Sequence, residues 1–261
     1  MEVIVLMKQT PDVALNIKVK DGAVVQDGLS WVISSWDETA LEAALQVTEA
    51  TGGEVTVLSI GPDRVQEALR KALAIGAHKA VHIQCDSTEG WDGFKTAKVL
   101  AKALEGRSFD LILAGKQAQD SDSGLTPTML AEFLGLPQVT NITALNDPSD
   151  TQVTLRRKGD AGTEIFKMTL PGLVTVNDSM VEPRLASMRG IMMAKKKPLE
   201  EVALDTLGLE PELLEAGGLM TERVQFDKPE ILKDGKKFEG DEGETIPQVF
   251  QQLKESTSLF A

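Results

Sequence analysis

A polar loop, Gly115–Thr126, contains residue types that can bind a phosphate group. In its sequence, GKQAQDSDSGLT, the glycines let a ligand approach the backbone, and the serine and threonine hydroxyls can hydrogen-bond an anion at a helix N-terminus. The carboxylates of Asp120 and Asp122 oppose a phosphate unless they face away or bind a ribose. A solvated turn explains the same polarity. The loop therefore predicts a nucleotide site, with a surface turn as the alternative.

Two further segments could belong to the same site. Ser34-Ser35-Trp36-Asp37 precedes an expected helix, and Ile60 ends an expected strand. Taken alone, Trp36 is explained as a core residue and Asp37 as a helix N-cap. In a doubly wound sheet, however, both segments lie at the same edge as Gly115–Thr126, where ligands bind. We therefore expect one nucleotide pocket at this edge.

Residues for acid–base, nucleophilic or metal chemistry are scarce. The only histidines are His78 and His82, and the only cysteine is Cys85. A metal site could be built from these three, but no fourth ligand is nearby in the sequence, and a structural role is expected instead. The sequence also lacks the glycine-rich, Walker, zinc-protease and serine-hydrolase motifs. We expect no catalytic acid, base or nucleophile in this chain, which is therefore not an enzyme by itself.

A basic segment, Glu182–Lys197, stands out in an acidic chain. Its sequence, EPRLASMRGIMMAKKK, joins an aperiodic set of apolar residues to arginines and lysines. A surface helix with methionines as filler is one explanation. The other is a protruding loop that binds a partner, because methionine side chains adapt well to irregular interfaces.

The elements that must position these segments follow from the apolar pattern. Short apolar runs predict buried strands at Glu2–Met7, Val55–Ile60, Lys79–Ile83, Asp110–Ala114 and Leu173–Val176. Helical spacing is expected after Asp37, around 65–73, and at Phe94–Leu104 and Thr128–Leu134. Hairpins are expected at Leu15–Val25 and Gln152–Leu170. This alternation predicts an α/β fold with a doubly wound, mostly parallel sheet and an added hairpin.

The expected organisation is one α/β nucleotide-binding domain and an extension. The domain covers residues 1–197 and includes the basic segment, whereas residues 198–261 form a C-terminal arm. The arm has scattered leucines (Leu207, Leu209, Leu213 and Leu214) and one expected helix near Val249–Leu253. Since these leucines are too few for a separate core, we expect the arm to wrap a partner.

Composition excludes several classes of protein. The 261 residues carry a formal net charge of −13, so the chain as a whole would repel a nucleic acid backbone. Aromatic residues make up only 4% and tyrosine is absent, which leaves little material for base stacking. No membrane span or signal peptide is expected, and the single cysteine fits a reducing compartment. We expect a cytoplasmic protein.

Four stretches together resemble the beta subunits of electron-transfer flavoproteins. These are VIVLMKQTPD, LSIGPDRVQEALRKALAIGAHKAVHI, LILAGKQAQDSDSG and VEPRLASMRGIMMAKKKPLE, in the order found in the family. The resemblance implies an adenine nucleotide alpha-hydrolase-like fold and a heterodimer with an alpha subunit that holds most of the FAD site. It also implies AMP in this chain and a loop that docks on acyl-CoA-type dehydrogenases of fatty acid beta-oxidation.

The resemblance also assigns residues by position. The implied cofactor-binding set is Leu6, Ser34, Ser35, Trp36, Asp37, Ile60, Gly115, Lys116, Gln117, Ala118, Gln119, Asp120, Ser121, Asp122, Ser123, Gly124, Leu125 and Thr126. The implied docking set is Arg184, Leu185, Met188, Arg189, Ile191, Met192, Lys195 and Lys196, with Met188 where the family usually places a leucine anchor. Two alternatives remain: a bifurcating subunit with a second FAD in the AMP pocket, and a stand-alone nucleotide-binding domain of the stress-protein or sulfurylase type.

Overall fold

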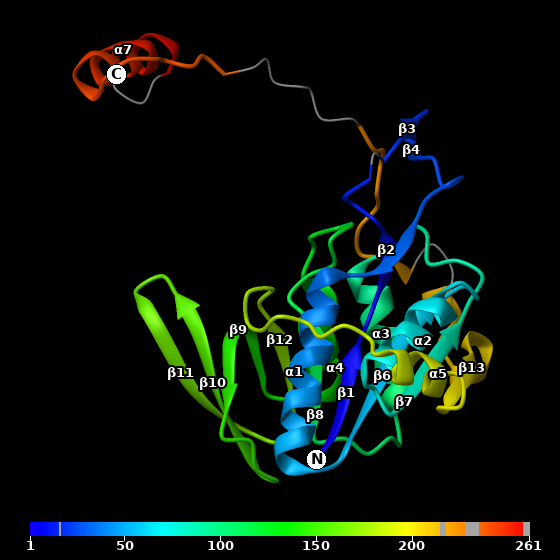
Figure 1. Ribbon diagram of the computed structural model, residues 1–261. Coiled ribbons are helices and arrows are strands. Elements are labelled where there is room, and N and C mark those ends of the chain that lie inside the picture. The colour runs from blue at the N-terminus through cyan, green and yellow to red at the C-terminus, as the bar shows by residue number, and fades with distance from the viewer. Residues whose placement is uncertain (16, 215–217, 228–234, 258–261) are drawn as a thin grey trace.

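A nine-stranded sheet forms the centre of the molecule (Figure 1). The computed structural model describes residues 1–15, 17–214, 218–227 and 235–257. The strand order is β11-β10-β9-β12-β8-β1-β6-β7-β13. Their bounds are β1 Glu2–Leu6, β6 Glu54–Gly61, β7 Lys79–Gln84, β8 Leu111–Gly115, β9 Gln138–Asn146, β10 Gln152–Gly159, β11 Gly162–Thr169, β12 Gly172–Val176 and β13 Leu199–Ala203. The strands from β9 to β13 in this order are parallel, and β10 pairs antiparallel with both its neighbours.

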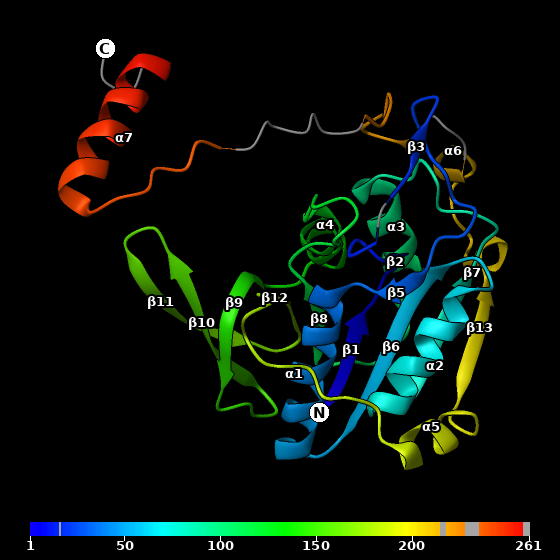
Figure 2. The same cartoon turned by 45° about the horizontal axis from the view of Figure 1, so that its top comes forward.

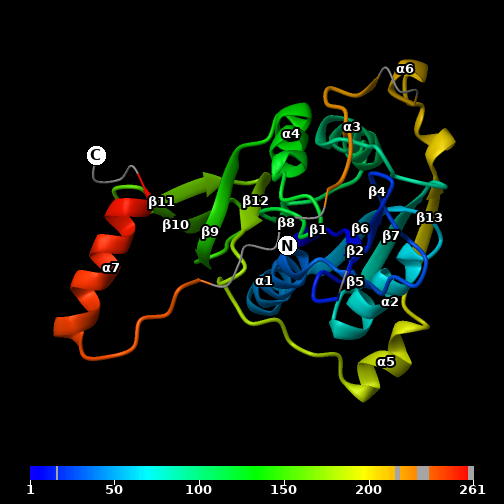
Figure 3. The same ribbon diagram turned by 90° about the horizontal axis from the view of Figure 1, so that it is seen from above.

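Helices cover both faces of the sheet, as a doubly wound fold requires (Figure 3). Helices α1 (Ser35–Thr51) and α2 (Val65–Ile75) contribute to the core on one face, and α3 (Gly93–Leu104) and α4 (Leu125–Leu134) to the core on the other. Helix α5 (Met188–Ala194) packs outside α2. Strands β8 and β12 are buried along their whole length, because apolar helices cover both sides of them. The expected α/β class is confirmed.

Two strands of the central sheet, β9 and β13, were not expected from the sequence. In β9, Asn141 has a left-handed φ of +58°, and the register with both neighbours shifts around Ile142, so that the bulge interrupts the alternation. Strand β13 lies at the edge of the sheet and pairs only with β7. None of its residues is fully buried, so its apolar pattern in the sequence is weak. Residues 199–203 of the expected arm are therefore part of the central sheet.

Three of the four scattered leucines after β13 pack on the domain of this chain, whereas the side chain of Leu214 lies outside what the structure describes. The 3-10 helix η1 (Leu204–Leu207) and α6 (Pro211–Leu214) follow β13, and Leu207, Leu209 and Leu213 pack against the core beneath α3. The Asp92 carboxylate then accepts backbone hydrogen bonds from Met220 (2.7 Å) and Thr221 (3.0 Å). Residues 204–213 and residues 220–221 are thus attached to the domain.

Smaller elements complete the fold. The expected first hairpin is present as β3 (Val19–Lys20) and β4 (Ala23–Val24), and β2 (Gln9–Pro11) pairs with β5 (Trp31–Ile33). Helix α7 (Glu242–Ser256) includes the expected C-terminal helix and stands apart from the sheet in the views of Figures 1 and 2. Within the described ranges, no helix has both the length and the apolar character needed to cross a membrane.

Candidate functional site

The chain reverses direction across the sheet beside β1, and this makes the carboxyl edge of the sheet there the candidate site. After β1, the chain builds β6 and β7 on one side and then returns to place β8 on the other side. In parallel sheets, ligands bind outside the carboxyl ends of the strands at such a switch point. The carboxyl ends of β1, β6 and β8 lie at one edge (Figure 2). The candidate segments around Ser34–Asp37, Ile60 and Gly115–Thr126 are all at this edge.

Asp37 joins the two strands that border the switch point. Its Oδ2 accepts a hydrogen bond from the backbone N–H of Lys8 (2.8 Å), just after β1, and its Oδ1 accepts one from the N–H of Gly115 (3.0 Å), at the end of β8. The expected N-cap role is wrong: Ser34 is the N-cap of α1, and its own side chain makes no capping bond. Burial raises the pKa of Asp37 to about 7, although the two backbone hydrogen bonds act to lower it.

The loop after β8 begins with a close backbone approach to α1. A Cβ atom on Gly115 would lie 2.5 Å from the Trp36 Cβ and 2.6 Å from the Asp37 Oδ1, so only glycine fits there. The centre of the Trp36 ring lies 5.7 Å from the ammonium of Lys116, the next residue of the loop. The sequence correctly placed both segments at one edge, but their direct contact depends on how α1 packs on β8.

Gln119 and Asp120 fold the middle of this loop back over the end of β1. The Gln119 Oε1 accepts from the Ser35 backbone N–H (3.3 Å), and its Nε2 donates to the Thr10 Oγ1 (3.0 Å). The Asp120 carboxylate pairs with the Lys8 ammonium at 2.8 Å. Lys8 and Thr10 were not among the expected site residues. Their signal in the sequence was their position directly after the first strand.

The end of the loop forms a tight turn into α4. Asp122 and Gly124 both have left-handed φ values, +50° and +64°. The Asp122 Oδ1 accepts from Gln117 Nε2 (2.7 Å), and the Ser123 Oγ accepts from the Leu125 backbone N–H (3.3 Å). Both loop aspartates are therefore engaged by groups of this chain, which lessens their repulsion of an anion. The amides at the start of α4, including that of Thr126, are of the kind that bind phosphate.

The apolar members of the expected set lie on the face covered by α3 and α4. Leu6 belongs to the core there, and Ile60 packs against that core while half-buried. Helix α4, which follows directly from Gly115–Thr126, covers this same face. The remaining expected residues, Ala118 and Ser121, form a turn in which the Ser121 N–H donates to the Ala118 carbonyl at 3.2 Å.

Both histidines make hydrogen bonds that join neighbouring strands or loops. The His78 Nδ1 accepts from the Val55 N–H (3.0 Å), and the fully buried His82 donates from Nε2 to the Gly61 carbonyl (2.8 Å). In the part of the chain that the structure describes, no three potential ligands gather as a metal site. The structural role expected for these histidines agrees with their contacts.

A hollow of about 290 Å³ lies at the opposite edge, near the amino ends of the strands. Glu2, Arg107 and Glu200 are among the residues that line it. The Arg107 guanidinium is already paired with both oxygens of Glu200, at 2.9 and 2.7 Å. Its charge is neutralised within the chain, so the carboxyl edge is the stronger candidate for a charged nucleotide.

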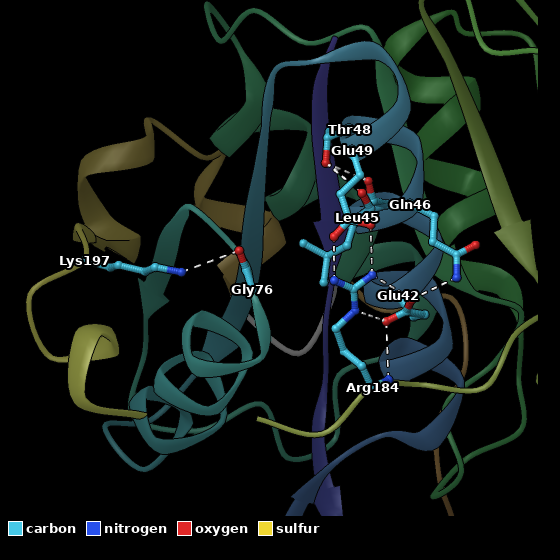
Figure 4. Close-up of polar contacts among 9 residues, drawn as sticks. Glu42, Leu45, Gln46, Thr48, Glu49, Gly76, Arg184 and Lys197 are labelled. Carbon is cyan, nitrogen blue, oxygen red and sulfur yellow. Dashed lines mark hydrogen bonds and ion pairs between the residues drawn. The ribbon is translucent and has the colours of Figure 1, made fainter. Parts of the chain in front are cut away.

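The basic segment Glu182–Lys197 presents an exposed apolar surface on and beside α5. We call this the α5 surface; its members, with exposed fractions, are Leu185 92%, Met188 77%, Ile191 49%, Met192 72% and Met193 45%. Of the expected basic members, Arg189, Lys195 and Lys196 are exposed around it. Arg184 instead points to α1, where it binds Glu42 and Glu49 (Figure 4).

Comparison with known proteins identifies the family. Residues 21–207 match the model of the electron transfer flavoprotein domain. The chain is 37% identical to the electron transfer flavoprotein subunit beta of Bacillus subtilis, over 99% of this chain and 100% of that protein. It is 38% identical to the subunit beta of Mycobacterium bovis, over 96% and 97% of the two chains, and 37% identical to that of Syntrophomonas wolfei, over 88% and 92%. The chain therefore belongs to the electron transfer flavoprotein family and corresponds to its beta subunits.

Proposed function

We propose that this chain pairs with an alpha subunit to form a cytoplasmic electron carrier, which takes electrons from an acyl-CoA-type dehydrogenase and passes them to a further acceptor. The observation that supports this best is the combination, in a chain of this family, of a topological switch point beside β1 with two exposed apolar surfaces. One is the α5 surface, and the other is on α7, a 15-residue helix with no buried residue. A stand-alone nucleotide-binding domain has no need of either surface.

In this proposal the carboxyl edge of the sheet beside β1 binds AMP. The backbone amides around Ser121–Thr126 would bind its phosphate, and Leu6 and Ile60 would contact the adenine. Asp120 or Asp122 would hold the ribose or stabilise the turn. FAD, held mainly by the alpha subunit, supplies the electron-carrying chemistry when bound. The residues of this chain bind and orient nucleotides and shape the cleft, and none of them needs to transfer a proton.

Nucleotide content is the first test of this assignment. The heterodimer, purified after co-expression and extracted with acid, is expected to release about one AMP and one FAD, because the proposal assigns a single phosphate site to this chain. Two FAD and no AMP would convert the assignment to a bifurcating subunit. A stable monomer or homodimer without FAD would instead support a stand-alone nucleotide-binding domain.

Met188→Ala tests the α5 surface as the docking site for the dehydrogenase. Met188 is our choice of anchor because it is 77% exposed and its unbranched side chain can fill an irregular pocket. Truncating a buried anchor typically costs more than about 1–2 kcal/mol of binding, which is roughly a tenfold loss. We therefore expect about a tenfold higher KM for the heterodimer in the dehydrogenase assay, with FAD and AMP content unchanged.

Lys195→Ala and Lys196→Ala serve as comparison variants for the charged rim. Because rim charges mainly affect the association rate, these variants should have smaller effects, visible chiefly at low salt. If Met188→Ala keeps the wild-type KM, Met188 is not the anchor. If deletion of residues 185–193 also leaves KM unchanged, the segment has no role in docking.

A further inference from the structure

The amino end of the docking segment is attached to α1 by Arg184. The Arg184 Nε donates to Glu42 Oε2 at 2.7 Å and its Nη2 donates to Glu42 Oε1 at 2.9 Å. Its Nη1 also donates to Glu49 Oε1 at 2.5 Å (Figure 4). The Glu42 side chain is only 5% exposed, whereas Arg184 is 36% exposed, so a guanidinium near the surface covers a buried carboxylate. Planar, bidentate pairing of this kind fixes orientation as well as position.

The carboxyl end of the segment is attached to α2. The Lys197 ammonium donates to the carbonyls of Leu73 (2.8 Å) and Ala77, in and just after the last turn of α2. A cation at a helix C-terminus also interacts favourably with the helix dipole. From the middle of α2, the Arg70 Nη1 donates to the carbonyls of Ala194 (2.8 Å) and Lys197 (2.9 Å).

Between these ends, α5 lies directly on α2. A Cβ on Gly190 would overlap the Ala74 carbonyl oxygen, so the two helix backbones are in close contact. The Ser187 Oγ caps α5 by accepting from the Gly190 N–H at 3.0 Å, and Ala194 is buried in the core beside α2. The inner side of α5 is therefore held in place, while the α5 surface faces outward.

We propose that Arg184 and Lys197 are positioning residues that hold the α5 surface in its binding orientation before the dehydrogenase arrives. This inference rests on the proposed docking function. Ordering a segment upon binding lowers affinity, so a segment that is already ordered binds more tightly with the same contacts. The positive charge of Arg184 is neutralised by two glutamates and does not attract the partner. That role belongs to Arg189, Lys195 and Lys196.

The ionisation of the glutamates agrees with this geometry. Burial acts to raise the pKa of Glu42, but hydrogen bonds from Arg184 and Gln46 hold it below its ordinary value. The pKa of Glu49 is also lowered, first by its hydrogen bond with Arg184. Both carboxylates are therefore charged at neutral pH and can pair with the Arg184 guanidinium there.

The test compares Arg184→Ala, Arg184→Lys and Lys197→Met in the co-purified heterodimer. Arg184→Ala and Lys197→Met are each expected to raise the KM for the heterodimer roughly tenfold in the dehydrogenase assay, with kcat and nucleotide content unchanged. Arg184→Lys should recover part of the affinity, because it keeps the charge but loses the planar fork. Amide hydrogen exchange should become at least about tenfold faster over 185–193 in the first two variants.

Arg157→Ala is the matched control, since it breaks another arginine–glutamate pair, with Glu164 (2.7 Å), on the β10–β11 hairpin. It should leave KM and exchange over 185–193 unchanged. If Met188→Ala raises KM but Arg184→Ala and Lys197→Met do not, the positioning inference is wrong and docking stands. If none of the three raises KM, both proposals fail. Should Arg184→Ala not fold, Arg184→Lys and Lys197→Met decide the matter by the same criteria.

Discussion

Asp37→Ala is expected to destabilise the carboxyl edge of the sheet more than any other single change at the candidate site. The substitution removes the acceptor of both the Lys8 and the Gly115 backbone N–H groups, and Asp37 itself is buried. A buried donor left without an acceptor costs about 1–3 kcal/mol, and the Gly115 N–H is buried whereas the Lys8 N–H is partly buried, so we expect a loss of roughly 2–4 kcal/mol of unfolding free energy at pH 5. For a chain of this size, each kcal/mol lowers Tm by about 2–4 °C. Thermal unfolding of the heterodimer measures this, and AMP content should fall with it.

The contribution of Asp37 to stability should also depend on pH. Its folded-state pKa of about 7 lies above its ordinary value of 3.8, so the unfolded chain releases this proton first as the pH rises. The stability due to the buried, protonated carboxyl is therefore complete below about pH 4 and is lost as pH rises through 7. From the size of the pKa difference, the loss is on the order of 4 kcal/mol.

Asp37→Asn is the control, because it does not titrate and keeps one acceptor oxygen. Other carboxylates, such as Glu42, also make the stability depend on pH, but they are present in both proteins. The difference in unfolding free energy between the wild-type protein and Asp37→Asn therefore reports on Asp37 alone. We expect the wild-type protein to lose unfolding free energy relative to Asp37→Asn as the pH rises from 4 to 7. A constant difference across that range would contradict the raised pKa.

Removal of residues 228–261 is expected to abolish assembly with the alpha subunit. Helix α7 carries an apolar stripe at helical spacing, formed by Ile246 (63% exposed), Val249 (38%), Phe250 (51%) and Leu253 (40%). An amphipathic helix of this kind binds in an apolar groove of a partner. Burial of each such side chain contributes about 1.5–3 kcal/mol, so loss of the stripe should weaken association more than about a hundredfold. Co-purification and FAD content measure the effect.

A matched pair of variants separates the stripe from the rest of α7. Ile246→Asp places a charge on the stripe, whereas Gln248→Asp places the same charge on the opposite side of the helix. Only the first should reduce recovery of the heterodimer. The full-length chain expressed alone should aggregate or bind no flavin. A colourless monomer with a sharp cooperative melt would count heavily against an obligate heterodimer.

Local pattern was sufficient for most of the elements. Strands such as β1 and β8 are short apolar runs because both of their faces are buried, and that property is visible in a few consecutive residues. The local pattern did not predict strands β9 and β13. In β9 the left-handed Asn141 shifts the register, and β13 is an edge strand covered on one side only.

The candidate site divides in the same way. The sequence by itself determined that Gly115–Thr126 follows a buried strand and that Glu182–Lys197 is basic and apolar, because both are properties of contiguous residues. Only the tertiary structure decided which distant groups meet. Asp37 accepts from Gly115, 78 residues away, and Arg184 binds Glu42, 142 residues away. Periodicity reports which side of an element is buried, whereas the partner of a buried charge depends on which elements the fold brings together.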